Sequence, residues 1–259
     1  MIKLENIDKY YNIGTVNEVC LFNNFNLNIN DKDFISVIGS NGSGKTSMLN
    51  LICGSLTPEK GKIILNGEDI TSQKEYVRSR KIGRVYQDPS MGTCPSMTIL
   101  ENMSLADNKG KPYGLSFGTN KKRIAYYKEL LSKLNLGLED MLESKVGALS
   151  GGQRQAMALL MTTMADIEFL ILDEHTAALD PKTAQLIMEL TDEIVREKNI
   201  TTIMVTHNLR FAVEYGNRII MMHKGNVLVD KAGEDKDNIV VDDLLDKFNE
   251  ISIESGNSL

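Results

Sequence analysis

The sequence predicts an α/β fold with two kinds of sheet, and three observations point to it. Apolar and polar residues alternate along the first thirty positions, most clearly at 24–30, with the period of half-buried strands in an antiparallel sheet. Strand-like runs at 169–172, 202–205 and 218–222 alternate with helical segments, as in a parallel, doubly wound sheet. The stretch 89–165 is instead helical in character. We therefore expect a mostly parallel core, an N-terminal antiparallel β subdomain and an inserted α-helical subdomain.

Local signals mark the individual elements. Residues 46–53 have helical character and end at Gly54, a residue suited to the left-handed position after a helix. Asp180 followed by Pro181 is a good helix start, because the carboxylate can cap free amides and proline tolerates the first helical position. Further strands are expected at 34–38, 63–65 and 82–86.

At 259 residues the chain is short enough for one domain built on an α/β core. We expect residues 1–88 and 166–230 to form the core with its antiparallel subdomain, 89–165 the helical subdomain, and 231–259 a short C-terminal helix of one or two turns with a polar tail. The net charge of −6 provides no general basic field, which argues against nucleic acid as a partner.

The cysteines and the apolar runs indicate a chain that works in a reducing environment and outside the bilayer. Cys20, Cys53 and Cys94 are too few and too widely spaced for a disulfide framework or a metal cluster, so all three are expected to be buried thiols. The N-terminus has no signal-peptide pattern, and no window approaches eighteen consecutive apolar residues.

Residues 39–46 fit the pattern G-x-x-x-x-G-K-[ST] between a predicted strand and a predicted helix, which is the context that this motif requires. Its glycines let successive amides and the helix N-terminus face phosphate oxygens, while Lys45 adds a cation near the terminal phosphates and Thr46 supplies a hydroxyl to Mg²⁺. The alternative is a glycine-rich turn that matches by accident. The residues expected to bind nucleotide are Gly39, Ser40, Asn41, Gly42, Ser43, Gly44, Lys45, Thr46 and Ser47.

A second element argues against that alternative. The apolar strand 169–172 ends in Asp173 and Glu174, as a Walker B element does in nucleoside triphosphatases. Asp173 is expected to hold the magnesium shell, and Glu174 to orient and deprotonate the attacking water. A helix-capping acid pair is the structural alternative. Together the two motifs predict a P-loop NTPase core of the RecA-like type.

The run 149–153, Leu-Ser-Gly-Gly-Gln, lies shortly before this strand, and here the sequence resembles the ABC ATPase family specifically. The resemblance covers nearly the whole chain, because the family's aromatic residue, Q-loop, D-loop and switch histidine also occur in order. It implies a subunit that binds and hydrolyses ATP with Mg²⁺. These landmarks are Tyr11, Gln87, 177–180 and His207.

The resemblance also implies a site shared between two copies of the chain. Ser150, Gly151 and Gly152 of one copy would cap the γ-phosphate held by Lys45 of the other, so that hydrolysis requires a homodimer. This suits the chemistry, since Ser150 is a good helix N-cap and the glycine amides after it present the positive end of a helix to an anion. The same resemblance adds Gln153 and Asp180 to the nucleotide-binding residues.

Other roles follow from the same resemblance. Tyr11 would stack on adenine, although the neighbouring Tyr10, or a plain core role, is an open alternative. Gln87 would touch the magnesium or the attacking water and report nucleotide state to a transporter-facing surface. His207 would contact the γ-phosphate and fix Glu174 and the water. The implied catalytic residues are Glu174, His207, Gln87 and Lys45, and the implied metal ligands are Thr46, Gln87 and Asp173.

The chain departs from the family pattern after the catalytic glutamate, where proline is usual and His175 stands here. Histidine frees the backbone angle and restores an amide donor, so a hydrogen bond can hold the D-loop in place of ring geometry. We interpret His175 as a subgroup marker, with a direct catalytic role as the alternative. Residues 14–19, 87–93 and 173–182 resemble a subgroup of bacterial ATPases that accompany a branched-chain-amino-acid-type permease and a substrate-binding lipoprotein.

The resemblance implies a peripheral subunit at the cytoplasmic face of the cell membrane that powers uptake, in some members of aromatic amino acids. An ATPase of an efflux, lipoprotein-release or division complex shares every catalytic motif and is the main alternative. Action on DNA or ribosomes is disfavoured because the chain has one cassette and no room for a long coiled coil. A permease is expected to dock at 91–103, where methionines suit either an adaptable groove or an ordinary core.

Overall fold

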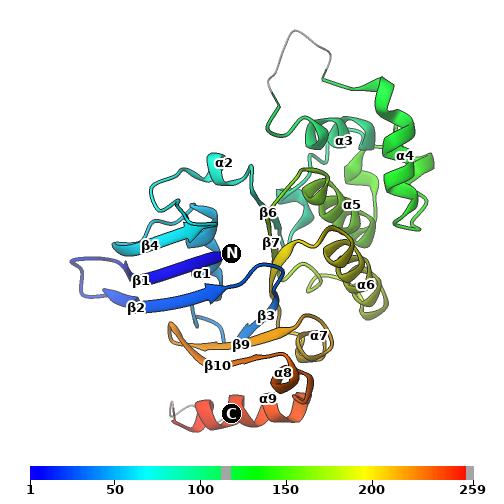
Figure 1. Cartoon of the computed structure of the whole chain (residues 1–259). Coiled ribbons are helices and arrows are strands. Elements are labelled where there is room, and N and C mark those ends of the chain that lie inside the picture. Colours follow the sequence, from blue (N-terminus) through cyan, green and yellow to red (C-terminus); the bar gives the residue numbers. More distant parts are fainter. Residues whose placement is uncertain (112–117, 255–259) are drawn as a thin grey trace. The chain divides into compact units, whose positions relative to one another are not determined.

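The computed structural model describes residues 1–111 and 118–254, which divide into two compact units. Unit 1 combines Met1–Arg78 with the residues from Thr201 onward, and unit 2 is Ser79–Ile200. Figure 1 labels many of their helices and strands. The fold is α/β with one antiparallel sheet and mostly parallel strands elsewhere, as the sequence predicts.

The first sheet of unit 1 is antiparallel and has the strand order β2-β1-β4-β5. Along β2, Phe25, Leu27 and Ile29 are buried while the intervening Asn26 and Asn28 are exposed. This alternation confirms the predicted half-buried strand. The strands are β1 (Ile2–Tyr11), β2 (Val19–Ile29), β4 (Lys60–Leu65) and β5 (Glu68–Asp69).

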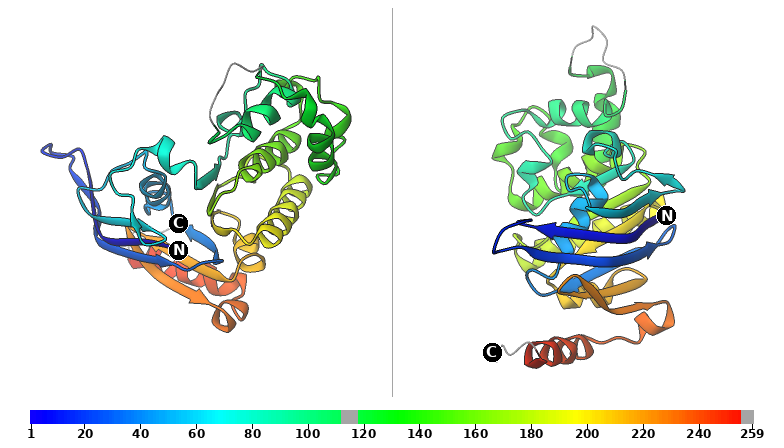
Figure 2. Two further views of the ribbon diagram at one scale, coloured as in Figure 1. Left: turned by 45° about the horizontal axis from the view of Figure 1, so that its top comes forward. Right: turned by 90° about the vertical axis from the view of Figure 1, so that its left-hand side faces the viewer.

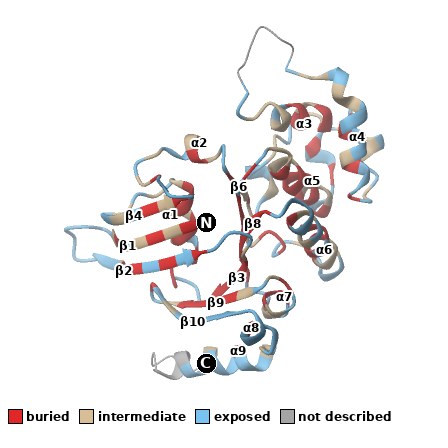
Figure 3. Ribbon diagram, viewed as in Figure 1, coloured by how far each residue is buried: buried red, intermediate tan, exposed pale blue. Residues whose placement is uncertain are grey.

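The second group of strands in unit 1 has β3 (Phe34–Gly39) at its centre. β3 runs parallel to β8 (Thr201–Val205) and to β9 (Arg218–His223), while β10 (Asn226–Ala232) pairs with β9 in the antiparallel sense. All six residues of β3 are buried, and Figure 3 colours the strand accordingly. A continuous apolar run is what a parallel strand buried on both faces requires.

The helices of unit 1 begin with α1 (Lys45–Cys53), which follows β3. Gly54 ends it in the left-handed region at φ 85°, and its amide donates to the Asn50 carbonyl at 2.9 Å. The predicted stop is therefore confirmed. The other helices of this unit are α2 (Glu75–Arg78), α7 (Leu209–Glu214), α8 (Glu234–Asp237) and α9 (Val241–Glu254).

The C-terminal helix is longer than the sequence indicated. One or two turns were expected, yet α9 has 14 residues. Its Leu244 is buried in a cluster with Ala212 of α7 and Ile219 of β9, and Phe248, one turn further on, packs against the same cluster. Figure 2 shows α9 from two further directions. Burial of this face supplies the stability that the local sequence signal lacked.

Unit 2 pairs β6 (Ile82–Val85) in parallel with β7 (Phe169–Asp173). Between 89 and 164, the secondary-structure elements that the structure describes are all helices, as predicted for this region. α5 and α6 lie side by side in Figures 1 and 2. The helical elements are η1 (Pro89–Met91), α3 (Ile99–Asp107), η2 (Lys121–Arg123), α4 (Ile124–Ser132), η3 (Leu138–Asp140), η4 (Val146–Ala148), α5 (Gly151–Met164) and α6 (Pro181–Lys198).

The methionines of unit 2 serve two environments. Met103 and Met157 are fully buried in the helical core beside Tyr127 and Leu131, whereas Met91 is 67% exposed. The ordinary core role therefore holds for Met103 and Met157, and Met91 remains available at the surface. Within residues 1–111 and 118–254, no helix combines the length and apolarity needed to cross a bilayer.

The expectation of three buried cysteines is wrong for two of them. Cys53 is buried at the end of α1, but Cys94 is only half-buried and Cys20 is exposed. Cys20 pairs with Tyr10 next to the turn that joins β1 to β2, where residues 12–20 are exposed. A position in a strand does not bury a side chain where the sheet extends past the core.

Candidate active site

The glycine-rich loop of unit 1 connects β3 to α1. At Gly39 the backbone has φ 152°, and a Cβ atom there would come within 2.3 Å of the Met222 carbonyl oxygen. Only glycine allows β9 to approach this closely. Within the loop, Ser43 and Gly44 are buried, whereas Ser40, Asn41, Gly42 and Thr46 are exposed.

Lys45 lies inside this loop. Its Nζ donates to the Gly39 carbonyl at 2.7 Å and to the Ser40 carbonyl at 3.0 Å, and the residue is 6% exposed. The main chain thus holds a cation at the start of α1. The helix offers no acidic residue in its first turn, and Gly44 provides no side-chain cap. Free amides and a fixed ammonium favour an anion such as a phosphate.

Tyr11 approaches α1 from the end of β1. Its hydroxyl lies 3.0 Å from Ser47 Oγ, and the Lys9 ammonium lies 5.7 Å from its ring centroid. Tyr10 instead pairs with Cys20 of β2, and hydrogen bonding with that thiol raises the pKa of Tyr10. Consecutive strand residues point to opposite faces. Of the two rings, Tyr11 therefore contacts the phosphate-loop helix.

His207 is exposed at the carboxyl end of β8, in the same unit as the loop. The preceding Thr206 donates its amide to the Val37 carbonyl of β3 at 3.1 Å, and the following Asn208 caps α7. Because β3 and β8 are parallel neighbours, His207 and the glycine-rich loop leave the same edge of the strands. Unit 1 thereby brings together Tyr11, residues 39–47 and His207.

Unit 2 has a comparable edge at the carboxyl ends of β6 and β7. Val85 pairs with Leu172, so that Gln87 follows one strand and Asp173 ends its parallel neighbour. Gln155 of α5 is buried and donates Nε2 to the Tyr86 carbonyl at 3.1 Å. This bond ties the helix of the 149–153 motif to the residue before Gln87. Sequence reasoning missed Gln155, since its partner is 69 positions away.

Asp173 is paired with an arginine that sequence reasoning also missed. Arg84 Nη2 donates to Asp173 Oδ2 at 2.6 Å, and both side chains are largely buried. The guanidinium also lies 4.8 Å from the ring centroid of Tyr86. A charged residue inside the short apolar strand 82–85 is the signal that could have revealed this partner, because a buried cation requires an anion nearby.

Glu174 adopts a left-handed backbone conformation at φ 49°, which is unusual for a residue other than glycine, asparagine or aspartate. Its carbonyl accepts the Ala177 amide at 3.0 Å, so the chain turns directly after β7. The next residue, His175, is 2% exposed, and burial lowers its pKa to about 4. A buried neutral imidazole fits a structural role better than direct proton transfer.

The 149–153 motif forms the start of α5. Ser150 accepts the Gln153 amide, and the Gln153 side chain accepts the Ser150 amide at 3.0 Å, which completes a capping box. The predicted N-cap is confirmed. A Cβ atom on Gly152 would lie 2.3 Å from Thr183 Cγ2 of α6. A side chain at this position would displace Thr183, so helix packing favours glycine here, whatever else the motif binds.

Asp180 is the N-cap of α6, as its position before Pro181 predicts. Its Oδ1 accepts the Thr183 amide at 3.1 Å, and hydrogen bonds from Thr183 lower the pKa of Asp180. Unit 2 thereby brings together Gln87, Asp173 and Glu174 at one strand edge, and the starts of α5 and α6 through Gly152 and Thr183.

The donor atoms predicted for magnesium are a threonine hydroxyl, a glutamine amide and a carboxylate. This oxygen-only set suits Mg²⁺, which takes few protein ligands and completes its shell with phosphate and water. Among the described residues, no group of three or more His, Cys, Asp or Glu side chains could hold a metal by itself. The chemistry of these donors therefore suits the magnesium ion that the sequence predicts. The donors are Thr46, Gln87 and Asp173.

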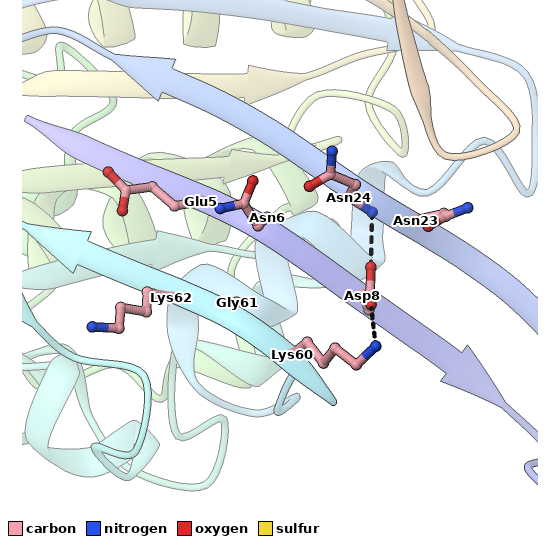
Figure 4. Close-up of a pocket in the computed structure, with 8 residues that line it drawn as sticks. All are labelled: Glu5, Asn6, Asp8, Asn23, Asn24, Lys60, Gly61 and Lys62. Atoms are coloured by element: carbon pink, nitrogen blue, oxygen red, sulfur yellow. Dashed lines mark hydrogen bonds and ion pairs between the residues drawn. The ribbon is translucent and has the colours of Figure 1, made fainter.

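A separate hollow of about 600 Å³ lies on the antiparallel sheet of unit 1 (Figure 4). Asp8 lies within it, 3.4 Å from Lys60 Nζ and 2.8 Å from the Asn24 amide. None of its eight lining residues belongs to the predicted nucleotide site. Asp8 and Lys60 pair within it, and we assign this hollow no part in the chemistry of the site.

A glycine-rich loop around a buried lysine, in a fold with an acid-ended parallel strand, defines a P-loop nucleoside triphosphatase. Residues 22–177 match the family described as ABC transporter. The chain belongs to this family as an ATP-binding subunit, and it hydrolyses ATP in a step coupled to transport.

Two relatives illustrate the similarity. A tyrosine transport ATP-binding protein of Clostridioides difficile is 48% identical over 248 residues, which cover 96% of this chain and 98% of that protein. An energy-coupling factor transporter ATP-binding protein of Caldanaerobacter subterraneus is 33% identical, over 87% of this chain and 77% of that protein.

Among solved structures, a dimeric ATP-binding cassette in a post-hydrolysis state, bound to ADP and Pi, matches with a TM-score of 0.76. It is 31% identical and covers 90% of this chain and 98% of its own. The match extends over both compact units.

Proposed function

We propose that this ATP-binding subunit works as a homodimer at the cytoplasmic face of the membrane and powers uptake of an amino acid through a permease. The supporting observation is the 48% identity, over nearly the whole length of both chains, to a tyrosine transport ATP-binding protein. An aromatic amino acid is therefore the cargo we infer. A substrate-binding protein outside the membrane would deliver it.

The residues of unit 1 are assigned to nucleotide binding. Residues 39–47 would wrap the phosphates, with the Lys45 ammonium moving from loop carbonyls to phosphate oxygens. Tyr11, which hydrogen-bonds with Ser47, would stack on adenine. His207 would contact the γ-phosphate from the end of β8.

The residues of unit 2 are assigned to hydrolysis and to the second half of the composite site. Asp173 and Gln87, with Thr46, would hold a magnesium ion that neutralises phosphate charge, and Glu174 would orient and deprotonate the attacking water. Residues 150–153 and Asp180 would face the nucleotide of the other copy. We retain residues 89–165 as the helical subdomain that receives the permease.

The motor assignment is tested with Glu174→Gln, which removes the base and keeps its shape. We expect MgATP to bind and a closed dimer to accumulate on gel filtration, while turnover falls at least ~100-fold, since general-base catalysis contributes ~10²–10⁴. Glu168→Gln is the matched control, because this carboxylate precedes the same strand and pairs with Lys81 at 3.5 Å. Normal turnover in Glu174→Gln would overturn the assignment of the base.

The direction of transport is tested on the complex copurified with its own membrane partner. In vesicles loaded with ATP and supplied externally with labelled tyrosine and the binding protein, we expect accumulation inside that Glu174→Gln abolishes. Recovery of a permease with a large extracytoplasmic domain, or outward movement of cargo, would instead identify an efflux, lipoprotein-release or division complex.

A further inference from the structure

His175 forms a side-chain contact with a residue that has no proposed catalytic role. Its Nε2 lies 3.2 Å from Thr191 Oγ1 on α6. Both residues are buried, His175 at 2% and Thr191 at 0% exposure. The bond joins the residue after Glu174 to the third turn of a helix that starts at Pro181.

The direction of this hydrogen bond follows from the other bond that Thr191 makes. The Thr191 hydroxyl donates to the Ile187 carbonyl at 2.6 Å, and a hydroxyl has only one proton to give. Oγ1 must therefore accept from His175, so Nε2 carries the proton of the imidazole.

The contact lies next to a residue with an unfavourable backbone conformation. Glu174 has φ 49°, a left-handed conformation that a residue of this kind adopts only when its surroundings impose it. On its N-terminal side Asp173 belongs to β7, and on its C-terminal side His175 is bonded to α6. The turn after it closes through Ala177. Strand and helix thus hold Glu174 from both sides.

We propose that His175 is a positioning residue for hydrolysis, whose Nε2–H bond to Thr191 fixes the backbone of Glu174 and thereby the direction of its carboxylate. The proposal rests on the proposed role of Glu174 as the base. It accounts for histidine where the family usually has proline: a tether to α6 supplies the restraint that a ring would supply through φ. General-base catalysis depends on such geometry, since a small misplacement of a reacting group lowers the rate strongly.

The first test is Thr191→Val, which keeps the shape of the side chain and removes the acceptor. We expect kcat for ATP hydrolysis by the full chain to fall about tenfold while the KM for ATP stays within about twofold. Thr191→Ser keeps the hydroxyl and should restore most of kcat. Thr163→Val is the matched control: Thr163 is also buried in unit 2, and the hydroxyl bonds that it makes to described residues go to carbonyls of its own helix.

A structural readout accompanies the kinetics. The chain has three histidines, so ¹⁵N-histidine spectra are simple to assign. We expect His175 to appear as the Nε2–H tautomer in the wild type and to change its Nε2 signal in Thr191→Val but not in Thr163→Val. An Nδ1–H tautomer in the wild type would overturn the proposal.

The outcomes separate this proposal from the proposed function. If Thr191→Val hydrolyses ATP like Thr163→Val while Glu174→Gln is inactive, the positioning role is wrong and the base assignment stands. If Thr191→Val does not fold, His175→Gln, which can replace the Nε2 donor, is compared with His175→Leu, which cannot. Full activity in His175→Leu would overturn the proposal, and loss in Leu with retention in Gln would support it.

Discussion

The glycine-rich loop of unit 1 and the acidic strand end of unit 2 hold their charged groups in different ways. In the loop, main-chain carbonyls of Gly39 and Ser40 hold the Lys45 ammonium. At the end of β7, a side chain from a distant position holds the charged group: Arg84 pairs with Asp173. A charged group held by the main chain requires a short run of particular residues in the sequence. A charged group held by side chains depends instead on residues that the fold brings together from distant positions.

The largest effect is expected from removing the charge held by the loop. Because a hydrogen bond to a charged group contributes ~1.5–3 kcal/mol, Lys45→Met should lower the affinity for ATP about 100-fold in calorimetric titration with magnesium present. Lys60→Met, an exposed lysine of the antiparallel sheet, is the control and should bind like the wild type. Wild-type affinity in Lys45→Met would show that the loop works without its cation.

A smaller effect is expected from breaking the side-chain pair of unit 2. Arg84→Met leaves Asp173 without this partner in a largely buried place, which should lower the free energy of unfolding by ~2 kcal/mol, between the values for exposed and fully buried pairs. Lys81→Met breaks an exposed pair with Glu168 next to the same two strands and should cost less than ~0.5 kcal/mol. Equal urea midpoints for the two variants would contradict the expected difference.

The next largest effect is expected from disturbing the packing at the start of α5. Gly152→Ala drives a methyl group into Thr183 and should cost ~1.5 kcal/mol of stability, as overpacking does. Gly151→Ala is the matched variant, since its Cβ would meet Leu179 at an ordinary 3.5 Å. Adding Thr183→Ser, which removes the opposing methyl, should restore the urea midpoint of Gly152→Ala. No recovery in the double variant would locate the strain elsewhere.

The smallest effect concerns the aromatic residue beside the loop. Tyr11→Ala should weaken ATP binding about fivefold, because stacking of a base on an aromatic ring contributes ~1–3 kcal/mol. Tyr11→Phe should stay within about twofold, since the bond to Ser47 is exposed to water. Tyr10→Ala provides the comparison, and a larger loss there would identify Tyr10 as the stacking ring.

Those parts of the structure that depend on neighbouring residues were predictable. Gly54 ends α1, Ser150 caps α5 and Asp180 caps α6, and each is recognised from the residues beside it because free amides or carbonyls at a helix end need partners close by. The strands before the glycine-rich loop and before Asp173 were equally predictable from the sequence, since a buried parallel strand is a continuous apolar run.

Contacts between distant positions were not predictable in this way. Arg84 and Asp173 are 89 positions apart, and they meet because β6 and β7 pair in a particular register. The length of α9 and the exposure of Cys20 depend on whether other elements pack against these segments. Local sequence patterns do not contain that information. His175 was recognised as unusual, but its partner Thr191 was not.

The order of the motifs can be read from the sequence itself. The sequence also determined the strand–loop–helix around Lys45 and the caps of the main helices, because these depend on hydrogen bonds within a few residues. Only the tertiary structure decided the partners of the buried polar groups: Arg84 for Asp173, Gln155 for the carbonyl of Tyr86, and Thr191 for His175. The physical reason is that a buried polar group must be paired, while the choice of its partner depends on strand register and helix packing.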